Sequence, residues 1–250
     1  MSDTALFIGT NHISLERTDS TNSYAKNLIT EERPPEGSLV TTIEQTAGRG
    51  QAGSSWQAEK GLNLTASYIL YPTFLAADRQ FFLNMAVSLA VRELCEELTG
   101  QEIRIKWPND IYHRNKKVAG ILIENTISGS NISAAVIGIG LNVNQTEFDP
   151  ALPNPISIRL VTGQEIPVGS VIQKLNSYLE KYYLQFRQLH FNFLDKAYTV
   201  HLYRYNQTAL YSRNGAEFRG EITGVTKEGK LIIDSNGREL KFGMKEVEYL

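Results

Sequence analysis

The sequence predicts an α+β fold in two parts, and three observations support this prediction. Strand and helix signals alternate along the chain up to about residue 203. From residue 204 onward the chain contains only short β-rich runs separated by turn dipeptides. The composition of the 250 residues, 42% hydrophobic and 21% charged, is that of an ordinary folded protein. We therefore expect a larger domain at residues 1–203 and a small one at residues 204–250.

The elements of the first part follow from apolar periodicity, helix caps and turn residues. Ser20 or Thr21 can cap a helix, because a side-chain hydroxyl accepts a hydrogen bond from a free amide of the first turn. Gly100 ends the next helix, since glycine adopts positive φ without a Cβ penalty. Ser128-Gly129-Ser130-Asn131 joins two apolar runs in a predicted hairpin. The expected strands are 12–17, 38–44, 62–70, 103–107, 118–126 and 132–141, and the expected helices are 20–29, 78–99, 168–190 and 193–203.

The last part of the chain predicts a small β-barrel. Its β runs are separated by Asn214-Gly215, Glu228-Gly229 and Asn236-Gly237. Asn-Gly is the strongest short hairpin signal, because both central residues of the favoured turn need positive φ. The spacing of these turns predicts about five strands.

Charge and cysteine content exclude several classes of protein. The 25 Lys and Arg residues against 27 Asp and Glu give a net charge of −2, so no overall field favours nucleic acid or an anionic membrane. Cys95 is the single cysteine, and the four histidines lack metal-ligand spacing, which excludes a disulfide framework and a zinc site. No apolar run is long enough for a membrane span, and the first residues do not resemble a signal peptide. We expect a cytoplasmic protein without a membrane partner.

A glycine-rich run, Gly48-Arg49-Gly50-Gln51-Ala52-Gly53, formally matches the dinucleotide-binding pattern G-x-G-x-x-G. A strand follows it where a Rossmann fold needs a helix, and Ser54 stands where a phosphate-binding P-loop needs lysine. Two interpretations stay open. The run is a flexible connection, or its backbone N–H groups and Arg49 approach an anionic ligand.

Three further strings have both a structural and a functional interpretation. Lys106-Trp107-Pro108-Asn109-Asp110 is a strand end with a turn, or a set of groups for a nucleotide phosphate and its metal. Two lysines precede the apolar strand in Lys116-Lys117-Val118-Ala119-Gly120-Ile121-Leu122. They are exposed charges that oppose aggregation of the strand, or they are part of a site. The glycines of Ile137-Gly138-Ile139-Gly140-Leu141-Asn142 weaken a strand unless backbone or ligand must approach closely.

Taken together, five strings resemble those of the biotin protein ligases in order and spacing. They are Asp19-Ser20-Thr21-Asn22, then Gln45-x-Ala47-Gly48-Arg49-Gly50 with Gly53 and Trp56, Lys106 to Asp110, Lys117 to Leu122, and Gly138 to Asn142. The resemblance is close over residues 12–145 and extends to the layout of the remainder. It implies a mixed β-sheet flanked by helices, similar to class II aminoacyl-tRNA synthetases, with an SH3-like C-terminal barrel.

The resemblance also implies a reaction and its participants. Biotin and ATP would give biotinyl-5′-adenylate and pyrophosphate, and a lysine of a biotin carboxyl carrier protein would then take the biotinyl group. Lys117 and Arg49 would be the catalytic residues, because joining a carboxylate to an α-phosphate requires cations at the reacting centre. The residues implied for biotin are Ser20, Thr21, Asn22, Gln45, Arg49, Gly50, Gln51, Lys117 and Gly120. Those implied for ATP are Arg49, Trp56, Lys106, Asn109, Asp110 and Asn142, with Mg²⁺ held by Asp110.

The sequence departs from the family at two positions of the glycine-rich run. Many members have a second arginine where this chain has Gln51, and a basic residue where it has Ser54, so retention of the adenylate is expected to be weaker. A lipoate protein ligase of the same fold is the alternative within the family. A non-catalytic biotin-binding or carrier-binding module is the alternative outside it, although such a module would not need both Arg49 and Lys117.

Two expectations concern partners other than the substrates. The chain begins almost at the expected catalytic domain, which leaves no room for the DNA-binding domain of some relatives, so we expect no specific DNA binding. Strands near the predicted hairpin could pair edge to edge with a second copy, which makes a homodimer one arrangement to test.

Overall fold

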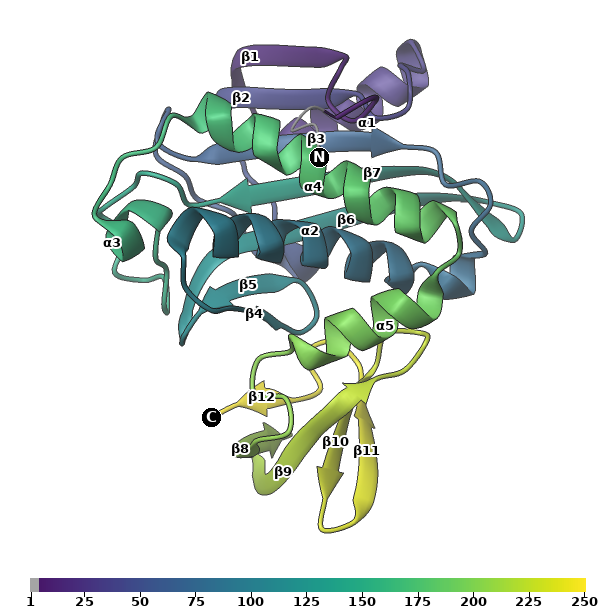
Figure 1. Ribbon diagram of the computed structural model, residues 1–250, viewed down its shortest axis with the longest axis vertical. Helices are drawn as coiled ribbons and strands as arrows, with labels where there is room; N and C mark the ends of the chain where they lie inside the picture. The colour runs from purple at the N-terminus through teal and green to yellow at the C-terminus, as the bar shows by residue number, and fades with distance from the viewer. Residues whose placement is uncertain (1–4) are drawn as a thin grey trace.

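The computed structural model describes residues 5–250, which contain two β-sheets and the helices that pack on them (Figure 1). The first sheet contains β1 (His12–Thr18), β2 (Leu39–Gln45), β3 (Leu64–Leu70), β4 (Ile103–Lys106), β5 (Asp110–His113), β6 (Lys116–Ser128) and β7 (Asn131–Leu141). The helices are α1 (Thr21–Glu31), α2 (Phe81–Thr99), α3 (Ile158–Thr162), α4 (Val168–Arg187) and α5 (Phe191–Val200). The second sheet contains β8 (Thr208–Arg213), β9 (Ala216–Val225), β10 (Leu231–Ser235), β11 (Arg238–Phe242) and β12 (Glu248–Tyr249).

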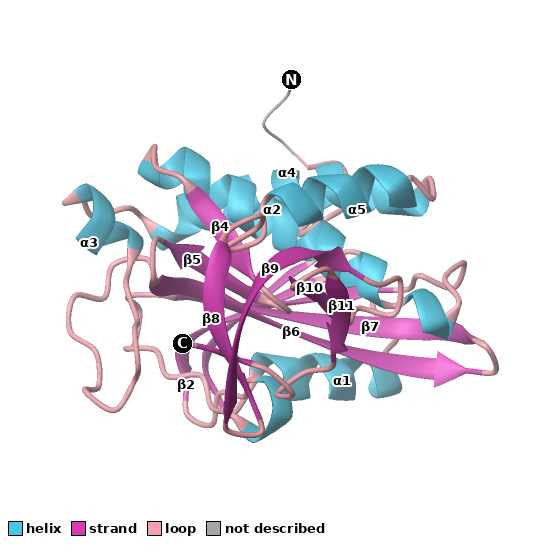
Figure 2. Ribbon diagram, turned by 90° about the horizontal axis from the view of Figure 1, so that it is seen from below, coloured by secondary structure: helices cyan, strands magenta, loops and turns pink. Residues whose placement is uncertain are grey.

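The first sheet has the strand order β1-β2-β3-β7-β6-β5-β4, in which β1 and β2 are parallel and the other neighbours antiparallel. Helices α2 and α4 cover one face and α1 covers the other (Figures 1 and 2). Because helices cover both faces near its centre, all seven residues of β3 are buried. The implied mixed sheet flanked by helices is therefore confirmed.

Helix α2 forms the middle of the core. It lies against α4, and its buried residues run almost without a break from Phe82 to Cys95. A helix that is buried on most sides needs this nearly continuous apolar composition. It ends at Gly100, whose φ of 62° is the left-handed conformation expected from the sequence.

Two elements of the structure were not expected from the sequence. Asp110 begins strand β5, whereas the structural interpretation of its string placed Asn109-Asp110 in a turn after Pro108. The actual turn lies between Lys106 and Asp110, which pair with each other across it, and it contains a cis peptide bond before Pro108. The short helix α3 was also missed, since five residues give too little periodicity to detect.

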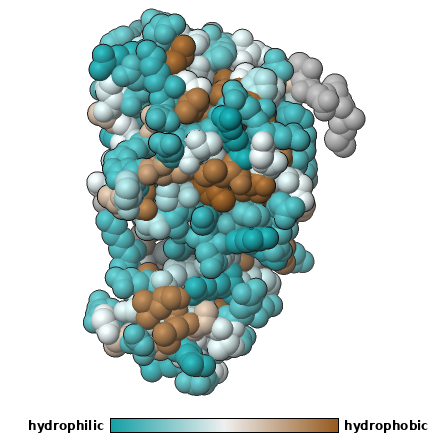
Figure 3. Space-filling view, turned by 90° about the vertical axis from the view of Figure 1, so that its left-hand side faces the viewer, coloured by the Kyte–Doolittle hydropathy of each residue, from teal (hydrophilic) through white to brown (hydrophobic). Residues whose placement is uncertain are grey.

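The second sheet has the strand order β11-β10-β9-β8-β12 with antiparallel pairing throughout, and β11 and β12 form its edges. Asn214, Gly215, Asn236 and Gly237 all have positive φ, which confirms the two Asn-Gly turns. The exposed Leu210 and Leu250 are neighbours joined by a backbone hydrogen bond of 3.2 Å, and Figure 3 shows a hydrophobic patch on this part of the surface.

The second sheet packs directly against the first part of the molecule. Trp107 donates from its indole nitrogen to the carbonyl oxygen of Gly229 at 2.9 Å, and β9 contacts α5. Tyr211 and Phe242 belong to the same hydrophobic cluster as the core around α2. No helix among residues 5–250 is long and apolar enough to cross a membrane.

Candidate active site

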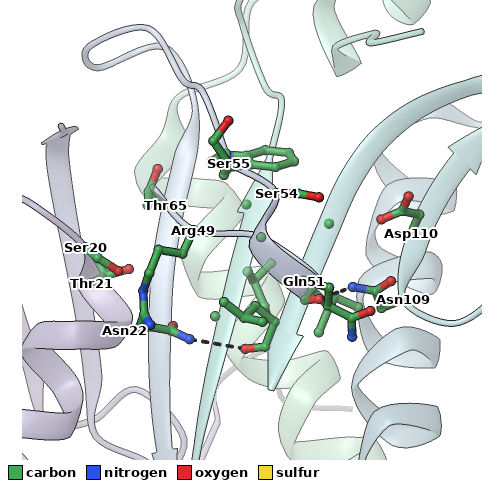
Figure 4. A pocket seen from close by; sticks show the side chains of 18 of the residues that line it. Ser20, Thr21, Asn22, Arg49, Gln51, Ser54, Ser55, Thr65, Asn109 and Asp110 are labelled. Atoms are coloured by element: carbon green, nitrogen blue, oxygen red, sulfur yellow. Dashed lines mark hydrogen bonds between the residues drawn. The ribbon is translucent and has the colours of Figure 1, made fainter. Parts of the chain in front are cut away.

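A pocket of about 290 Å³ opens on the face of the first sheet that carries α1. Figure 4 shows Ser20, Thr21 and Asn22 on one side of it and Asn109 and Asp110 on the other. The sequence-predicted residues that line it are Ser20, Thr21, Asn22, Gln45, Arg49, Gly50, Gln51, Trp56, Asn109, Asp110, Lys117 and Gly120. These residues come from α1, β2, the run after β2, and the strands β5 and β6, so the fold gathers segments that are distant in sequence.

The floor of the pocket contains glycines of β6 and β7 that leave room for two side chains. A Cβ on Gly138 would lie 2.3 Å from Oδ1 of Asn22, and one on Gly140 would lie 2.2 Å from the Trp56 indole. Gly120 is the neighbour of Gly140 in the β6–β7 pairing. The glycines of the β7 string therefore permit close approach, as the functional interpretation of that string requires. The Trp56 indole N–H is buried without a hydrogen-bond partner among the described residues.

The polar side of the pocket is held in one orientation by a network of hydrogen bonds. The backbone N–H of Thr21 donates to Oε1 of Gln45 at 2.9 Å. Asn22 accepts from the Ser67 hydroxyl at 2.6 Å and donates from Nδ2 to Glu124 at 2.9 Å. Thr21 and Asn22 are buried and are the first two residues of α1, which Ser20 caps. Fixed donors and acceptors of this kind can recognise a neutral polar ligand group.

Arg49 is paired with a carboxylate that the sequence analysis did not single out. Its guanidinium donates to both oxygens of Glu124, at 2.9 and 3.3 Å, and Lys26 contacts the same carboxylate at 2.5 Å. Burial raises the pKa of Glu124, but the bonds from Lys26 and Asn22 and the charges of Lys26 and Arg49 outweigh this effect and hold the pKa below its usual value. The run between Gly48 and Trp56 is thus fastened to β6.

Lys117 and Asp110 form the second ion pair of the pocket. Their Nζ and Oδ1 atoms are 2.6 Å apart, and both side chains are about one-quarter to one-third exposed, at 31% and 25%. The backbone N–H of Lys117 donates to the carbonyl oxygen of Asn154 at 2.8 Å. Asn109 donates from its side chain to the carbonyl oxygen of Ile121, which ties the turn before β5 to β6. A strand-held cation beside a carboxylate can bind a phosphate and a metal together.

Lys106 and Asn142 do not line the pocket. The ammonium nitrogen of Lys106 lies 4.9 Å from the Tyr249 ring centroid and 5.0 Å from that of Tyr112. Burial lowers the pKa of Lys106, while the nearby charge of Asp110 opposes this. Asn142 is buried and donates from Nδ2 to the carbonyl oxygen of Ile156 at 3.1 Å, which stabilises the chain after β7.

Several lining residues were missed by the sequence analysis. Gly138 and Gly140 carried a signal, because glycine is unusual within a strand, but they were not assigned to the site. Glu124 was also missed; it does not line the pocket but pairs with Arg49, which does. Met244 and Lys245 come from the segment between β11 and β12, and only the three-dimensional fold brings them to the pocket.

The metal-binding capacity of the pocket is limited to one carboxylate. Asp110 is the single acidic residue that lines it, and within residues 5–250 no group of three or more His, Cys, Asp or Glu residues could hold a metal ion. Mg²⁺ commonly uses one or two carboxylates together with substrate phosphates and water. Asp110 therefore fits a metal that arrives with a nucleotide.

Comparison with known sequences finds similarity along most of the chain. Residues 14–142 match the profile of the Biotin/lipoate A/B protein ligase family. The chain is 30% identical over 227 residues to the biotin--[acetyl-CoA-carboxylase] ligase of Paracoccus denitrificans, covering 88% of this chain and 92% of that protein. It is also 30% identical over 217 residues to the bifunctional ligase/repressor BirA of Bacillus subtilis (strain 168). That alignment covers 86% of this chain and 66% of the relative.

Comparison with solved structures supports the fold. A biotin protein ligase from Aquifex aeolicus in complex with biotin and ATP superposes with a TM-score of 0.80 at 24% identity, covering 96% of this chain and 100% of that one. A biotin protein ligase from Leishmania major in complex with biotinyl-5-AMP gives a TM-score of 0.63 at 21% identity, covering 94% and 99%. Both enzymes share the architecture described above.

Proposed function

Because this chain belongs to the biotin/lipoate A/B protein ligase family, we propose that it is an ATP-dependent biotin protein ligase. It activates biotin to biotinyl-5′-adenylate and transfers the biotinyl group to a lysine of a biotin carboxyl carrier protein. The names of the relatives in Paracoccus denitrificans and Bacillus subtilis support the reaction type. The cytoplasmic location, the absence of specific DNA binding, a homodimer and the division at residue 203 stay predictions from the sequence.

The observation that carries the proposal is the combination of two chemistries in one pocket. Thr21, Asn22 and Gln45 offer oriented neutral donors and acceptors, which suit the ureido ring of biotin. Arg49 and Lys117 offer cations for a carboxylate and a phosphate. A lipoate ring has no ureido group, so it would form fewer hydrogen bonds with these groups than biotin, each of which contributes about 0.5–1.5 kcal/mol.

The first step joins two anions, and the pocket residues reduce the repulsion between them. An oxygen of the biotin carboxylate forms a bond to the α-phosphorus of ATP, and the bond from that phosphorus to the pyrophosphate oxygen breaks. Lys117 is the cation nearest to Asp110, and we assign its ammonium group to the charge that develops on the phosphate. Arg49 exchanges its contact with Glu124 for the ligand anion. The run from Gly48 to Trp56 then shields the hydrolysable adenylate from water.

Mg²⁺ fits beside Asp110, the acidic lining residue, and neutralises phosphate charge when it is bound. Asp110 would hold the ion, and its ion pair with Lys117 orients the ammonium group of that lysine.

In the second step, the amine of the carrier lysine attacks the carbonyl carbon of the adenylate, and AMP leaves with the electrons of the broken C–O bond. The attacking amine must be uncharged, so the rate is expected to rise with pH as the carrier lysine loses its proton. The open side of the pocket, where Met244 and Lys245 lie at the rim, leaves the adenylate accessible to a protein substrate.

The proposal is tested by exchange of labelled pyrophosphate into ATP, measured with biotin, with lipoate and without either acid. We expect exchange that depends on biotin and is at least about a hundredfold weaker with lipoate, since unpaired buried polar groups reject an analogue strongly. Exchange that requires lipoate would identify a lipoate ligase. If the protein binds biotin but catalyses no exchange with either biotin or lipoate, a non-catalytic binding module would be favoured.

A further inference from the structure

We propose that Lys245, from the C-terminal sheet, is a phosphate-binding residue of the pocket and contacts the phosphate groups of the nucleotide. This inference rests on the proposed function, since it names a residue for one substrate of that reaction. Met244 and Lys245 line the same pocket as Arg49, Gln51 and Lys117. They are separated from those residues by more than a hundred positions of sequence and belong to another sheet.

The segment that carries Lys245 is a tight, anchored turn. It connects β11 with β12, and the buried side chains of Phe242 and Val247 fix its two ends. The backbone N–H of Gly243 donates to Oε2 of Glu246 at 2.7 Å, and the N–H of Glu246 donates to the carbonyl oxygen of Gly243 at 3.2 Å. Lys245 itself has a φ of 63°, in the left-handed region that costs a non-glycine residue energy. The turn therefore presents a defined pair of residues, Met244 and Lys245, to the pocket.

The charges of the pocket explain why a further cation is useful. The charged lining residues are Arg49, Asp110, Lys117 and Lys245. Arg49 is paired with Glu124 and Lys117 with Asp110, so each of these cations has a carboxylate at 2.9 Å or less. A triphosphate chain carries several negative charges, so a third lining cation beside Arg49 and Lys117 would favour its binding. Lys245 adds positive charge from the connection between β11 and β12 of the second sheet.

The glycine-rich run makes the same requirement stronger. Gln51 and Ser54 both line the pocket and are neutral, so Arg49 is the only charged lining residue that the run supplies. A lysine is a flexible point charge that can reach a phosphate from the rim of a pocket. Lys245 therefore supplies from the C-terminal sheet a charge that the run itself does not contain.

The test compares Lys245→Gln with Lys241→Gln in the full chain, using calorimetric titration with ATP and with adenosine. Lys241 lies on β11 outside the pocket lining and controls for the loss of one surface charge. Glutamine is one atom shorter than lysine, but it is polar, uncharged and keeps the backbone cost of the turn. We expect Lys245→Gln to raise the dissociation constant for ATP about tenfold, equivalent to about 1.4 kcal/mol. Adenosine binding should change less than about twofold, because adenosine has no phosphate.

Lys241→Gln should bind ATP like the unchanged protein, and Lys245→Arg should retain most of the affinity because it keeps the charge. An ATP affinity of Lys245→Gln within about twofold of the unchanged protein would overturn the proposal, as would an equal loss in Lys241→Gln. Because these titrations contain no biotin, their outcome is separate from that of the exchange assay. A protein that binds ATP through Lys245 but shows no biotin-dependent exchange would contradict the proposed function alone.

Discussion

The floor of the pocket and the glycine-rich run above it each hold one cation against one carboxylate, yet they do so in different ways. Lys117 belongs to β6 and Asp110 to β5, two neighbouring strands of a seven-stranded sheet. Arg49 lies outside the regular strands, its side chain is 42% exposed, and it reaches across to Glu124 on β6. The comparison indicates that the floor fixes a charge, whereas the run carries a charge that can change partner.

Glycine serves different purposes in the two regions. Gly140 in the floor has no room for a Cβ, because the Trp56 indole lies 2.2 Å from that position. Gly53 in the run has open space around it but a φ of 85°, which L-residues rarely adopt. The floor therefore needs glycine for close packing, and the run needs it for the path of its backbone.

The largest effect should come from removing the floor cation. Lys117→Ala should reduce adenylate formation at least about a thousandfold while biotin affinity stays within about tenfold, because this charge stabilises mainly the transition state. Single-turnover formation of biotinyl-adenylate and equilibrium biotin binding would measure the two quantities. Lys116→Ala, which alters the exposed neighbour, is the matched control. Normal exchange kinetics in Lys117→Ala would remove Lys117 from the mechanism.

A methyl group added to the floor should weaken ATP binding by about ten- to a hundredfold, because Trp56 is among the residues expected to bind ATP. In Gly140→Ala the new Cβ displaces the Trp56 indole, and overpacking of this kind costs about 1–3 kcal/mol. Gly53→Ala is the counterpart in the run, and its Cβ meets no atom within 4 Å. Calorimetry with ATP should separate the two variants. Equal affinities would show that the two glycines do not differ in function.

The charge of the glycine-rich run can be increased by placing an arginine at Gln51. Gln51→Arg should slow release of preformed biotinyl-adenylate by about ten- to a hundredfold, because a charge-assisted hydrogen bond contributes about 1.5–3 kcal/mol and each 1.4 kcal/mol is a factor of ten. Stopped-flow measurement of release would show this. An unchanged rate in Gln51→Arg together with faster release in Gln51→Ala would mean that the glutamine already makes the contact.

The smallest effect is expected from Glu124→Gln, which keeps an acceptor for Asn22 but removes the charge that holds Arg49. A partly exposed ion pair contributes only about 0.2–1 kcal/mol, so biotin affinity should change less than about fivefold. Tryptic cleavage after Arg49 should become about two- to fivefold faster as the run loosens. Lys26→Gln, which removes a different partner of Glu124, should leave that cleavage rate nearly unchanged. Equal cleavage of Glu124→Gln and the unchanged protein would contradict the anchoring role.

The pH dependence of this anchor has a definite sign. The pKa of Glu124 is lowered in the folded protein, so the anchor contributes stability above the ordinary glutamate pKa and loses it as the pH falls through the lower folded value. Cleavage after Arg49 at neutral pH should therefore be insensitive to pH. The difference in the free energy of unfolding between Glu124→Gln and the unchanged protein should disappear in acid, where Glu124 is protonated. Denaturant unfolding at several pH values would measure it.

Much of the fold could be predicted because its signals are local. Ser20, Gly100 and the two Asn-Gly turns act within a few residues of themselves, and the structure has a cap, a helix end and two hairpins there. Strand β5 could not be predicted, since its four residues follow a proline and carry no alternation that distinguishes them from a turn. Its pairing with β4 and β6 is a property of the sheet.

The site residues likewise fall into those that the sequence could predict and those that it could not. The segments around Asn22, Arg49 and Lys117 carry recognisable strings, and the fold does bring them to one pocket. Glu124 and Lys245 were beyond such reasoning, because a carboxylate within a strand and a lysine in a turn are ordinary surface features until the packing of the elements is known. Conversely, Lys106 stands within a recognisable string but lies between two tyrosine rings outside the pocket lining.

The central claim, that this pocket activates biotin for transfer to a protein, is tested most directly by the mass of the acceptor. A purified carrier domain of a biotin-dependent carboxylase is incubated with the enzyme, biotin and ATP, and its intact mass is measured. We predict the gain of one biotinyl group, dependent on ATP and absent with Lys117→Ala or with a carrier whose acceptor lysine is replaced by arginine. An unmodified carrier, under conditions where the enzyme is folded and binds both biotin and ATP, would contradict the account.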